Sequence, residues 1–317
     1  MSGGKRGVDS CSTKAYPFNL SLVDHFRLSS FGAPSTGKIA YRGVMKRMFV
    51  LLALIGAPVT AQQSKPEIIV EGHAVSPADA RQYVTQITDT REGQIARFHR
   101  PVCPIVVGLP DETNAKILAR IRKTAQSLGA ELGSEQCDAN LVMLVTDNSD
   151  QSLSDLRRTR ESWFDGLSHA EIETLVADKS AARAWSVVSL RNEDGERVYD
   201  EDDRSEARSM RVKSASFIRR ATRLDIEGTV IMIERSAANG KTIAQLADYA
   251  AMRGLARTRP PKNSSISSIL TLFDAVEGSP MPGLTTSDQA YLRALYRFSG
   301  TETLSDARSR LSRGIAR

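Results

Sequence analysis

The chain has 317 residues, with 43 basic and 37 acidic side chains and a formal net charge of +6. Its hydrophobic fraction of 41% is that of an ordinary globular protein, which excludes a wholly disordered, collagen-like or polytopic membrane protein. Three cysteines are too few for a fold built on a disulfide scaffold.

The segment 45–61 has the three parts of a secretory signal peptide. A basic start at 45–47 precedes ten apolar residues at 48–57 and a short region of small residues that ends at Ala61. We predict cleavage between Ala61 and Gln62, and therefore export to the periplasm. Ten apolar residues are about half of what a membrane-spanning helix needs, so a membrane anchor is the weaker alternative.

Residues 1–44 precede this signal and have no sustained apolar period. We expect them to be an unstructured extension, with Met45 as the true first residue; a genuine N-terminal extension is the alternative. Residues 1–61 hold eight of the basic and two of the acidic residues, so 35 of each remain from Gln62 onward. This neutral mature chain has no electrostatic reason to bind nucleic acid, and we expect neither a nucleic-acid partner nor a transmembrane span in it.

The first part of the mature chain, residues 62–190, is predicted to be an α/β subdomain. Apolar runs at 102–109 and 141–145 predict two buried strands, and apolar residues at helical spacing over 111–128 predict a helix between them. Such a strand-helix-strand order is typical of a parallel βαβ unit. Further elements are predicted in chain order: a strand at 68–70, a helix from Pro77 capped by Ser76, a helix from Ser168 to about Asp178, and a strand at 185–190.

A change of composition follows at 191–213, where eight acidic and six basic residues occur among 23. We predict a charged loop or linker there, and a second, α+β subdomain at 214–298. A polar tail is predicted at 299–317. The elements predicted for the second subdomain are strands at 215–224 and 228–234, helices at 242–255 and 266–273, and a last helix that Thr285 caps. The fold class is therefore α+β or mixed α/β, with a βαβ unit followed by a strand-strand-helix-helix part.

Recognisable catalytic and metal-binding motifs are missing from the sequence. The mature chain has three histidines, His73, His99 and His169, and none lies within seven residues of another. The sequence contains no HExxH, CxxC, Gly-rich nucleotide-binding or GxSxG pattern. We expect His99 to be an exposed side chain and His169 to lie in the first turn of a capped helix. We therefore predict no catalytic residue, no metal ligand and no cofactor.

The two cysteines of the mature chain are predicted to form a disulfide. Cys103 begins one predicted strand and Cys137 comes just before the next. In a parallel βαβ unit both strand starts lie at the same end of the sheet, so the sulfur atoms can meet. An oxidising periplasm favours the bond, which would stabilise the fold by about 3–4 kcal/mol in the chain-entropy description. A nucleophilic cysteine is the competing interpretation, but no motif supplies its base.

The mature chain has two resemblances, of which the first covers most of its length and the second its C-terminal part. The stretches 98–104, 107–110, 245–253 and 284–296 resemble uncharacterised exported proteins of sphingomonad-type Alphaproteobacteria, a resemblance that implies no activity. The C-terminal part is also similar to zincin-like domains of unknown function. An active zincin would carry HExxH where this chain has Gln245 to Tyr249, so the resemblance implies a non-catalytic relative.

These observations favour a non-catalytic periplasmic or envelope-associated protein that binds a ligand or a partner, such as an envelope protein. The sequence leaves open whether the protein is an enzyme, and the missing catalytic motifs argue against it. The alternative is a hydrolase with an unrecognised site, derived from a zincin-like metallopeptidase. The sequence identifies neither the ligand nor the partner.

Overall fold

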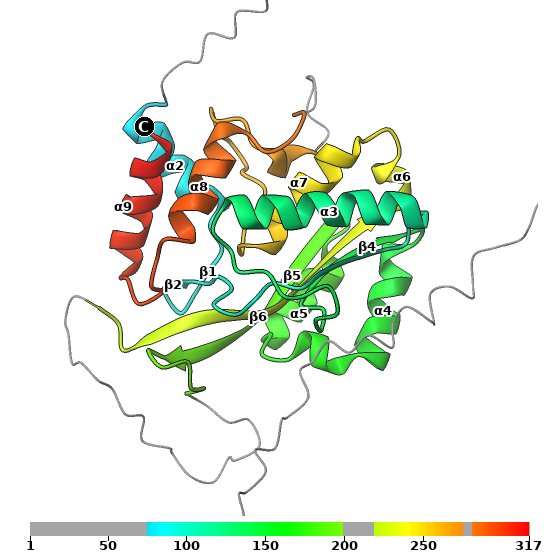
Figure 1. Ribbon diagram of the computed structural model, residues 1–317, viewed down its shortest axis with the longest axis horizontal. Coiled ribbons are helices and arrows are strands. Elements are labelled where there is room, and N and C mark those ends of the chain that lie inside the picture. The colour runs from blue at the N-terminus through cyan, green and yellow to red at the C-terminus, as the bar shows by residue number, and fades with distance from the viewer. Residues whose placement is uncertain (1–74, 199–218, 275–280, 317) are drawn as a thin grey trace, which may run out of the picture.

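The computed structural model describes residues 75–198, 219–274 and 281–316 (Figure 1). The predicted extension, signal peptide and cleavage site at Ala61–Gln62 lie outside these residues, as do His73 and most of the charged segment 191–213. The helices are α2 (Pro77–Ile87), α3 (Asp111–Ser127), α4 (Ser149–Thr159), η1 (Glu161–Phe164), α5 (His169–Ala177), α6 (Arg235–Ala238), α7 (Ile243–Gly254), η2 (Ile269–Thr271), α8 (Thr286–Leu295) and α9 (Leu304–Ile315). The strands are β1 (Thr90–Arg91), β2 (Gln94–Ile95), β3 (Pro104–Val107), β4 (Leu141–Thr146), β5 (Ala182–Asn192) and β6 (Thr222–Glu234).

A mixed four-stranded sheet organises the fold, with strand order β3-β4-β6-β5. Strands β3, β4 and β6 are parallel, and β5 joins β6 in antiparallel orientation. The predicted βαβ unit is confirmed, because α3 connects the parallel strands β3 and β4. Among the described residues β5 forms one edge of the sheet, and this position matters for the candidate site.

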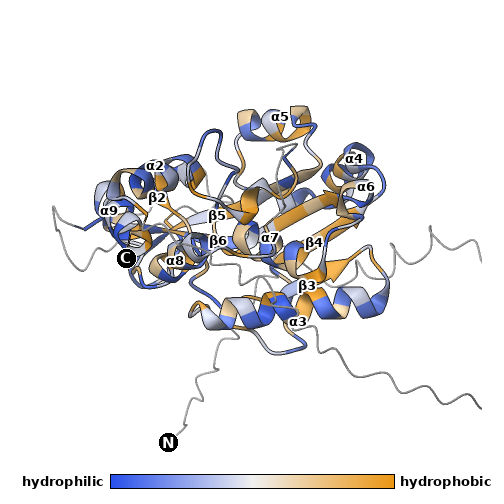
Figure 2. Ribbon diagram, turned by 90° about the horizontal axis from the view of Figure 1, so that it is seen from above, coloured by the Kyte–Doolittle hydropathy of each residue, from blue (hydrophilic) through white to orange (hydrophobic). Residues whose placement is uncertain are grey.

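Helices cover both faces of the sheet (Figure 2). Alternate residues of a strand point to opposite faces, so Leu141 and Met143 of β4 pack with α3 and α7, whereas Val142 and Leu144 pack with α4, η1 and α5. All six residues of β4 are buried, as its continuous apolar run predicts. Helices α2, α8 and α9 form a third group, on the left in Figure 1, on the side of the sheet where β5 ends and β6 begins.

Side-chain caps begin several helices at the predicted residues. Ser76 accepts a hydrogen bond from the amide of Asp79 at the start of α2. Ser168, Thr242 and Thr285 each form a reciprocal capping box with the acidic or amide residue three positions later. Each box satisfies amide groups that the first helical turn leaves without partners. These local signals explain why the helix starts could be predicted.

The predicted disulfide is also present in the structure. Cys103 and Cys137 are bonded, with Cα atoms 5.9 Å apart. Pro104 pairs in register with Leu141, so both cysteines lie at the same end of the sheet. A Cβ atom at Gly133 would lie 2.5 Å from the Cys137 sulfur, so the chain needs glycine at this position to pass the bond.

Several predicted elements of the C-terminal part need correction. The helix expected at 266–273 is only the short 3-10 helix η2. The strands expected at 215–224 and 228–234 are one strand over 222–234, because β6 continues through the charged residues Asp225 and Glu227; residues 215–218 lie outside the described part. The polar tail expected after Ser299 contains α9, whose Ala307, Leu311 and Ile315 are buried against α2 and α8. The apolar positions of α9 are few, and the helix gains its stability from this packing.

The two predicted subdomains contribute strands to the same sheet and side chains to the same hydrophobic cluster. Strand β5, at the end of 62–190, pairs with β6 over eleven positions, and one hydrophobic cluster includes residues from Ala80 to Ile315. No helix among the described residues is long and apolar enough to cross a membrane.

Candidate functional site

A pocket of about 400 Å³ opens at the free edge of β5, between α5 and the C-terminal end of α7. It touches three consecutive residues of the strand, Ala184, Trp185 and Ser186. Successive strand residues point to opposite faces, so a pocket that touches all three lies along the strand edge. Helix α5 contributes Leu175, and the extended segment after α7 contributes Thr258. Pockets of this size are typical of small-molecule sites.

Arg253, in the last turn of α7, is the unusual residue of this pocket. Its side chain lines the pocket although the residue is only 8% exposed. The guanidinium forms no ion pair with any described residue, and its Nε and Nη1 atoms have no hydrogen-bond acceptor. Nη2 has only a contact of 3.5 Å with the carbonyl oxygen of Ala184. A buried charge without a partner is costly, so an anion in the pocket would find its partner already in place.

The other charged groups of the pocket are already satisfied or exposed. Arg257 donates to Asp89 at 2.6 Å and to Glu171 at 3.2 Å. Arg259 is exposed at the rim and donates to the carbonyl of Gln86. Asp178, which is half-buried, accepts a hydrogen bond from the amide of Ser180. Arg253 is therefore the buried arginine of this pocket that has no carboxylate partner, which leaves it as the group best placed to bind an anion.

The apolar side of the pocket is rigidly built. Trp185 stacks on Phe164 with ring centroids 5.3 Å apart, and its indole N–H donates to the carbonyl of Trp163 at 2.9 Å. Leu167 and Leu175 complete this side. A fixed aromatic wall beside a cation suits a ligand with both an acidic group and an apolar part.

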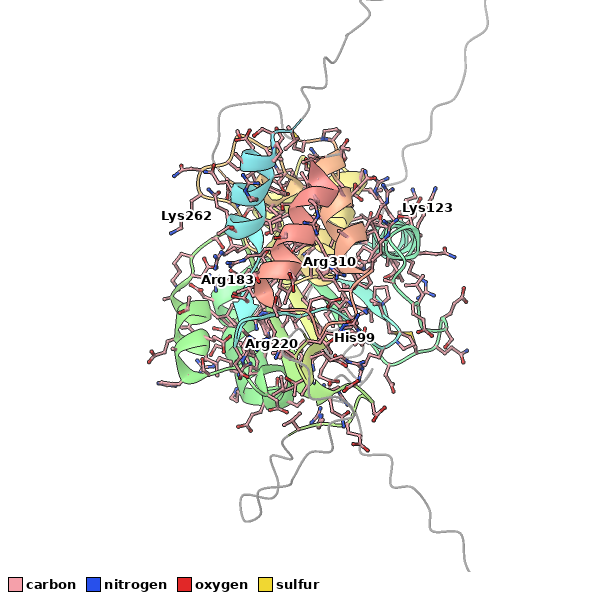
Figure 3. All side chains as sticks on the ribbon, turned by 90° about the vertical axis from the view of Figure 1, so that its left-hand side faces the viewer. His99, Lys123, Arg183, Arg220, Lys262 and Arg310 are labelled. Carbon is pink, nitrogen blue, oxygen red and sulfur yellow. A yellow bond between two sulfur atoms is a disulfide. The ribbon has the colours of Figure 1, made fainter. Side chains whose placement is uncertain are left out.

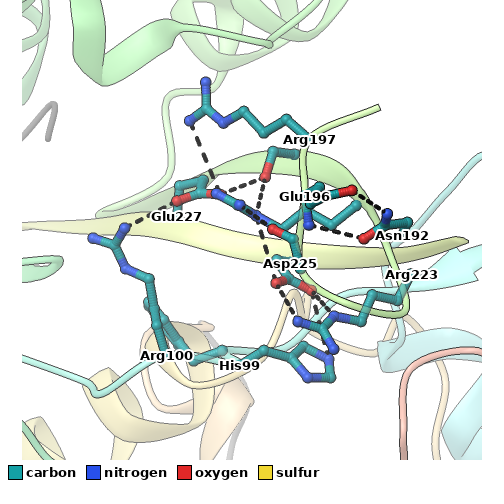
Figure 4. A network of polar contacts seen from close by, with 12 residues as sticks. His99, Arg100, Asn192, Glu196, Arg197, Arg223, Asp225 and Glu227 are labelled. Carbon is teal, nitrogen blue, oxygen red and sulfur yellow. Dashed lines mark hydrogen bonds and ion pairs between the residues drawn. The ribbon is translucent and has the colours of Figure 1, made fainter. Parts of the chain in front are cut away.

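A separate cluster of charges lies farther along β5 and β6 (Figure 4). Glu227 is almost fully buried and accepts hydrogen bonds from Arg191 at 2.5 Å, from Arg100 at 3.0 Å and from Ser189. Burial acts to raise the pKa of Glu227, but the hydrogen bonds from Ser189 and Arg191 outweigh it and leave the pKa lowered. Its acceptors are thus used within the protein, and we interpret this cluster as structural.

The prediction that His99 is an exposed side chain is wrong, because the structure buries this side chain. Its side chain is 7% exposed, and Nε2 lies 3.7 Å from Asp225, beyond hydrogen-bond distance. Burial, followed by the positive charges of Arg97 and Arg223, lowers the pKa of His99 to about 3. His99 is therefore neutral near pH 7. His169, in the first turn of α5 as predicted, lies 3.1 Å from Glu173 on the surface.

The segment where a zincin would carry its metal ligands is used to hold the fold together. Gln245 closes the capping box of α7 and donates to the carbonyl of Met281. Asp248 accepts two hydrogen bonds of 2.8 Å from Arg120 and one from the amide of Leu284. Tyr249 is buried against Phe273. In the described part of the chain, no three His, Cys, Asp or Glu side chains come together as metal ligands would.

The pocket residues were not predicted from the sequence. Arg253 occupies the last turn of a helix, where a basic residue is ordinarily solvated and stabilises the helix dipole, so its burial has no local signal. Comparison with protein-family models, with curated proteins and with solved structures finds no match for this chain. The arguments for function therefore rest on this chain's own geometry.

Replacing Arg253 by methionine should leave the free energy of unfolding unchanged or raise it. The methionine keeps most of the apolar stem and removes a buried charge that has no partner. Arg120→Met is the matched control, since it leaves the carboxylate of Asp248 on the same helix without its guanidinium. This control should lose about 1–3 kcal/mol. Urea unfolding of both variants without ligand checks the prediction, and equal destabilisation would show that Arg253 has a structural role.

The protein should lose stability as the pH falls from 7 to 5, in part because of His99. The unfolded chain binds a proton near pH 6.5, whereas the buried imidazole resists protonation until about pH 3. This difference costs about 2 kcal/mol between pH 7 and pH 5. His99→Gln should show a correspondingly smaller loss in urea unfolding at the two pH values. The same pH dependence in both proteins would contradict the burial of a neutral imidazole.

Proposed function

We propose that the mature protein is a non-catalytic binding protein of the periplasm that takes an anionic ligand into the pocket at the edge of β5. The observation that carries this proposal is Arg253, a buried guanidinium at the pocket wall without a carboxylate partner. Buried cations are ordinarily paired within the protein, as Arg183, labelled in Figure 3, is with Asp150 at 2.7 Å. An unpaired one at a pocket is expected where the partner arrives with the ligand.

A carboxylate is the anion that the pocket suits best. Arg253 supplies charge-assisted donors, and the wall of Trp185, Leu167 and Leu175 supplies apolar contact beside them. Thr258 lines the opposite side, but its hydroxyl donates to the carbonyl of Met252. The lining also includes three carboxylates, of which Asp89 and Glu171 pair with Arg257. Arg253 is thus the buried cation of the pocket that has no carboxylate partner, and its place beside the apolar wall suits a small organic acid.

Export is supported by two independent features. The sequence of 45–61 has the order of a signal peptide, and the disulfide between Cys103 and Cys137 requires an oxidising compartment to persist. Hydrolase activity remains the second hypothesis. It lacks a candidate site among the described residues, since Gln245, Asp248 and Tyr249 have structural partners or are buried.

Protein isolated from the periplasm of its native host should begin at Gln62 or within two or three residues of it. Signal cleavage after Ala61 is the reason, and intact-mass measurement with N-terminal sequencing is the test. The same protein should show no free thiol, because Cys103 and Cys137 are linked in the folded chain. An intact N-terminus at Met1 on cytosolic protein, with two free thiols, would contradict export.

Acetate should bind the mature protein and change the fluorescence of Trp185, while acetamide, its neutral counterpart, should not. In Arg253→Met the dissociation constant for acetate should rise at least tenfold, as the loss of a charge-assisted hydrogen bond predicts. Arg259→Met, which removes the exposed guanidinium at the rim, is the control and should change the constant less than about threefold. Equal affinity of the protein and Arg253→Met for acetate would refute the proposed site.

A further inference from the structure

We infer that the ligand of this pocket is the C-terminal end of an extended peptide, whose carboxylate meets Arg253 and whose backbone pairs with β5. The inference rests on the proposed function and makes it more specific. Two features of the strand edge, beyond the charge of Arg253, point to a peptide.

The first feature is the direction of the backbone groups of β5. The carbonyl oxygens of Ala182 and Ala184 accept hydrogen bonds from Ser180 Oγ at 3.1 Å and from Arg253 Nη2 at 3.5 Å, on the side away from β6. In an antiparallel strand every second residue directs both its N–H and its C=O to the same side. The backbone N–H and C=O of Ser186 therefore point away from β6, as those of Ala184 do. Both residues line the pocket and direct backbone groups away from β6 there, and the carbonyl oxygen of Ala184 already has the 3.5 Å contact with Arg253.

The second feature is an extended segment on the other side of the pocket. Residues 257–259 run antiparallel to 87–89, with hydrogen bonds from Asp89 to Arg257 and from Arg259 to Ile87. This pattern leaves the backbone N–H and C=O of Thr258 directed away from Thr88. Thr258 and Ser186 thus border the same pocket with backbone groups that another strand can use.

An extended peptide matches these groups in order. Its terminal carboxylate neutralises Arg253 next to Ala184, and its amide groups pair with Ala184 and Ser186 as an added strand does. Its last side chain lies against Trp185 and Leu175, which favours an apolar residue at that position. A simple carboxylic acid uses the cation alone and leaves the strand edge unpaired.

The test compares N-acetyl-Ala-Ala-Leu, its C-terminal amide and acetate on the full mature protein, with Trp185 fluorescence as the readout. The free acid should bind at least tenfold more tightly than acetate and at least tenfold more tightly than the amide. In Arg253→Met the acid and the amide should bind with equal affinity. A peptide acid that binds no better than acetate overturns the inference and leaves the proposed function standing, whereas failure of both probes rejects the two together.

Methylation of the peptide nitrogens tests the backbone pairing without altering the protein. Along an added strand, alternate N–H groups point toward β5. N-methylation at one of the two C-terminal amide positions should therefore weaken binding at least tenfold, and methylation at the neighbouring position less than threefold. Equal effects at both positions, or no effect at either, overturn the pairing with β5.

Discussion

Strand β6 pairs along its length with two different neighbours, and this double pairing decides where the other elements lie. Over 229–234 it runs parallel to β4, and over 222–233 it runs antiparallel to β5. The parallel side brings the βαβ unit and its disulfide into the sheet. The antiparallel side places β5 at an edge, where its outer backbone groups border the pocket. The candidate site is thus a consequence of the one antiparallel strand in the sheet.

The buried carboxylates of the described fold have hydrogen-bonding partners within the protein, whereas the buried guanidinium of Arg253 has no carboxylate partner. Asp288 accepts from Tyr83 at 2.5 Å, from Ser268 at 2.6 Å and from two backbone amides. Glu227 and Asp248 are satisfied in the same way by arginines and by further donors. Breaking such a pair leaves an uncompensated charge, so each pair holds its elements in place. A fold that satisfies its carboxylates this fully would gain by pairing Arg253 too; in the proposed function, the ligand supplies the partner that Arg253 lacks.

How far the sequence predicts this structure depends on whether the deciding signal is local. Helix caps and apolar runs are local, so the starts of α2, α5 and α8 and the strands of the βαβ unit were predictable. The continuity of β6 was not predictable, because acidic residues such as Asp225 and Glu227 are typical of a turn. In the fold, Arg191 and Arg100 from other segments bind Glu227, and Arg223 of the same strand binds Asp225. The burial of His99 and Arg253 has the same origin. Both depend on packing between segments far apart in the chain, which no short window of sequence contains.

The position of the pocket differs from the usual one in sheets with parallel strands. Ligands of such sheets ordinarily bind beyond the carboxyl ends of the parallel strands. In this protein, side chains that follow the parallel strands close the carboxyl ends. Asp147 after β4 pairs with Arg235 after β6 at 2.5 Å, and Ser149 donates to Glu234 at 2.7 Å. A Cβ atom at Gly108, after β3, would lie 1.9 Å from the carbonyl oxygen of Val145, so the chains there are in direct contact. With the carboxyl end of the parallel strands occupied, the outer side of β5 offers backbone groups beside the pocket, and Arg253, which has no carboxylate partner, lies there too.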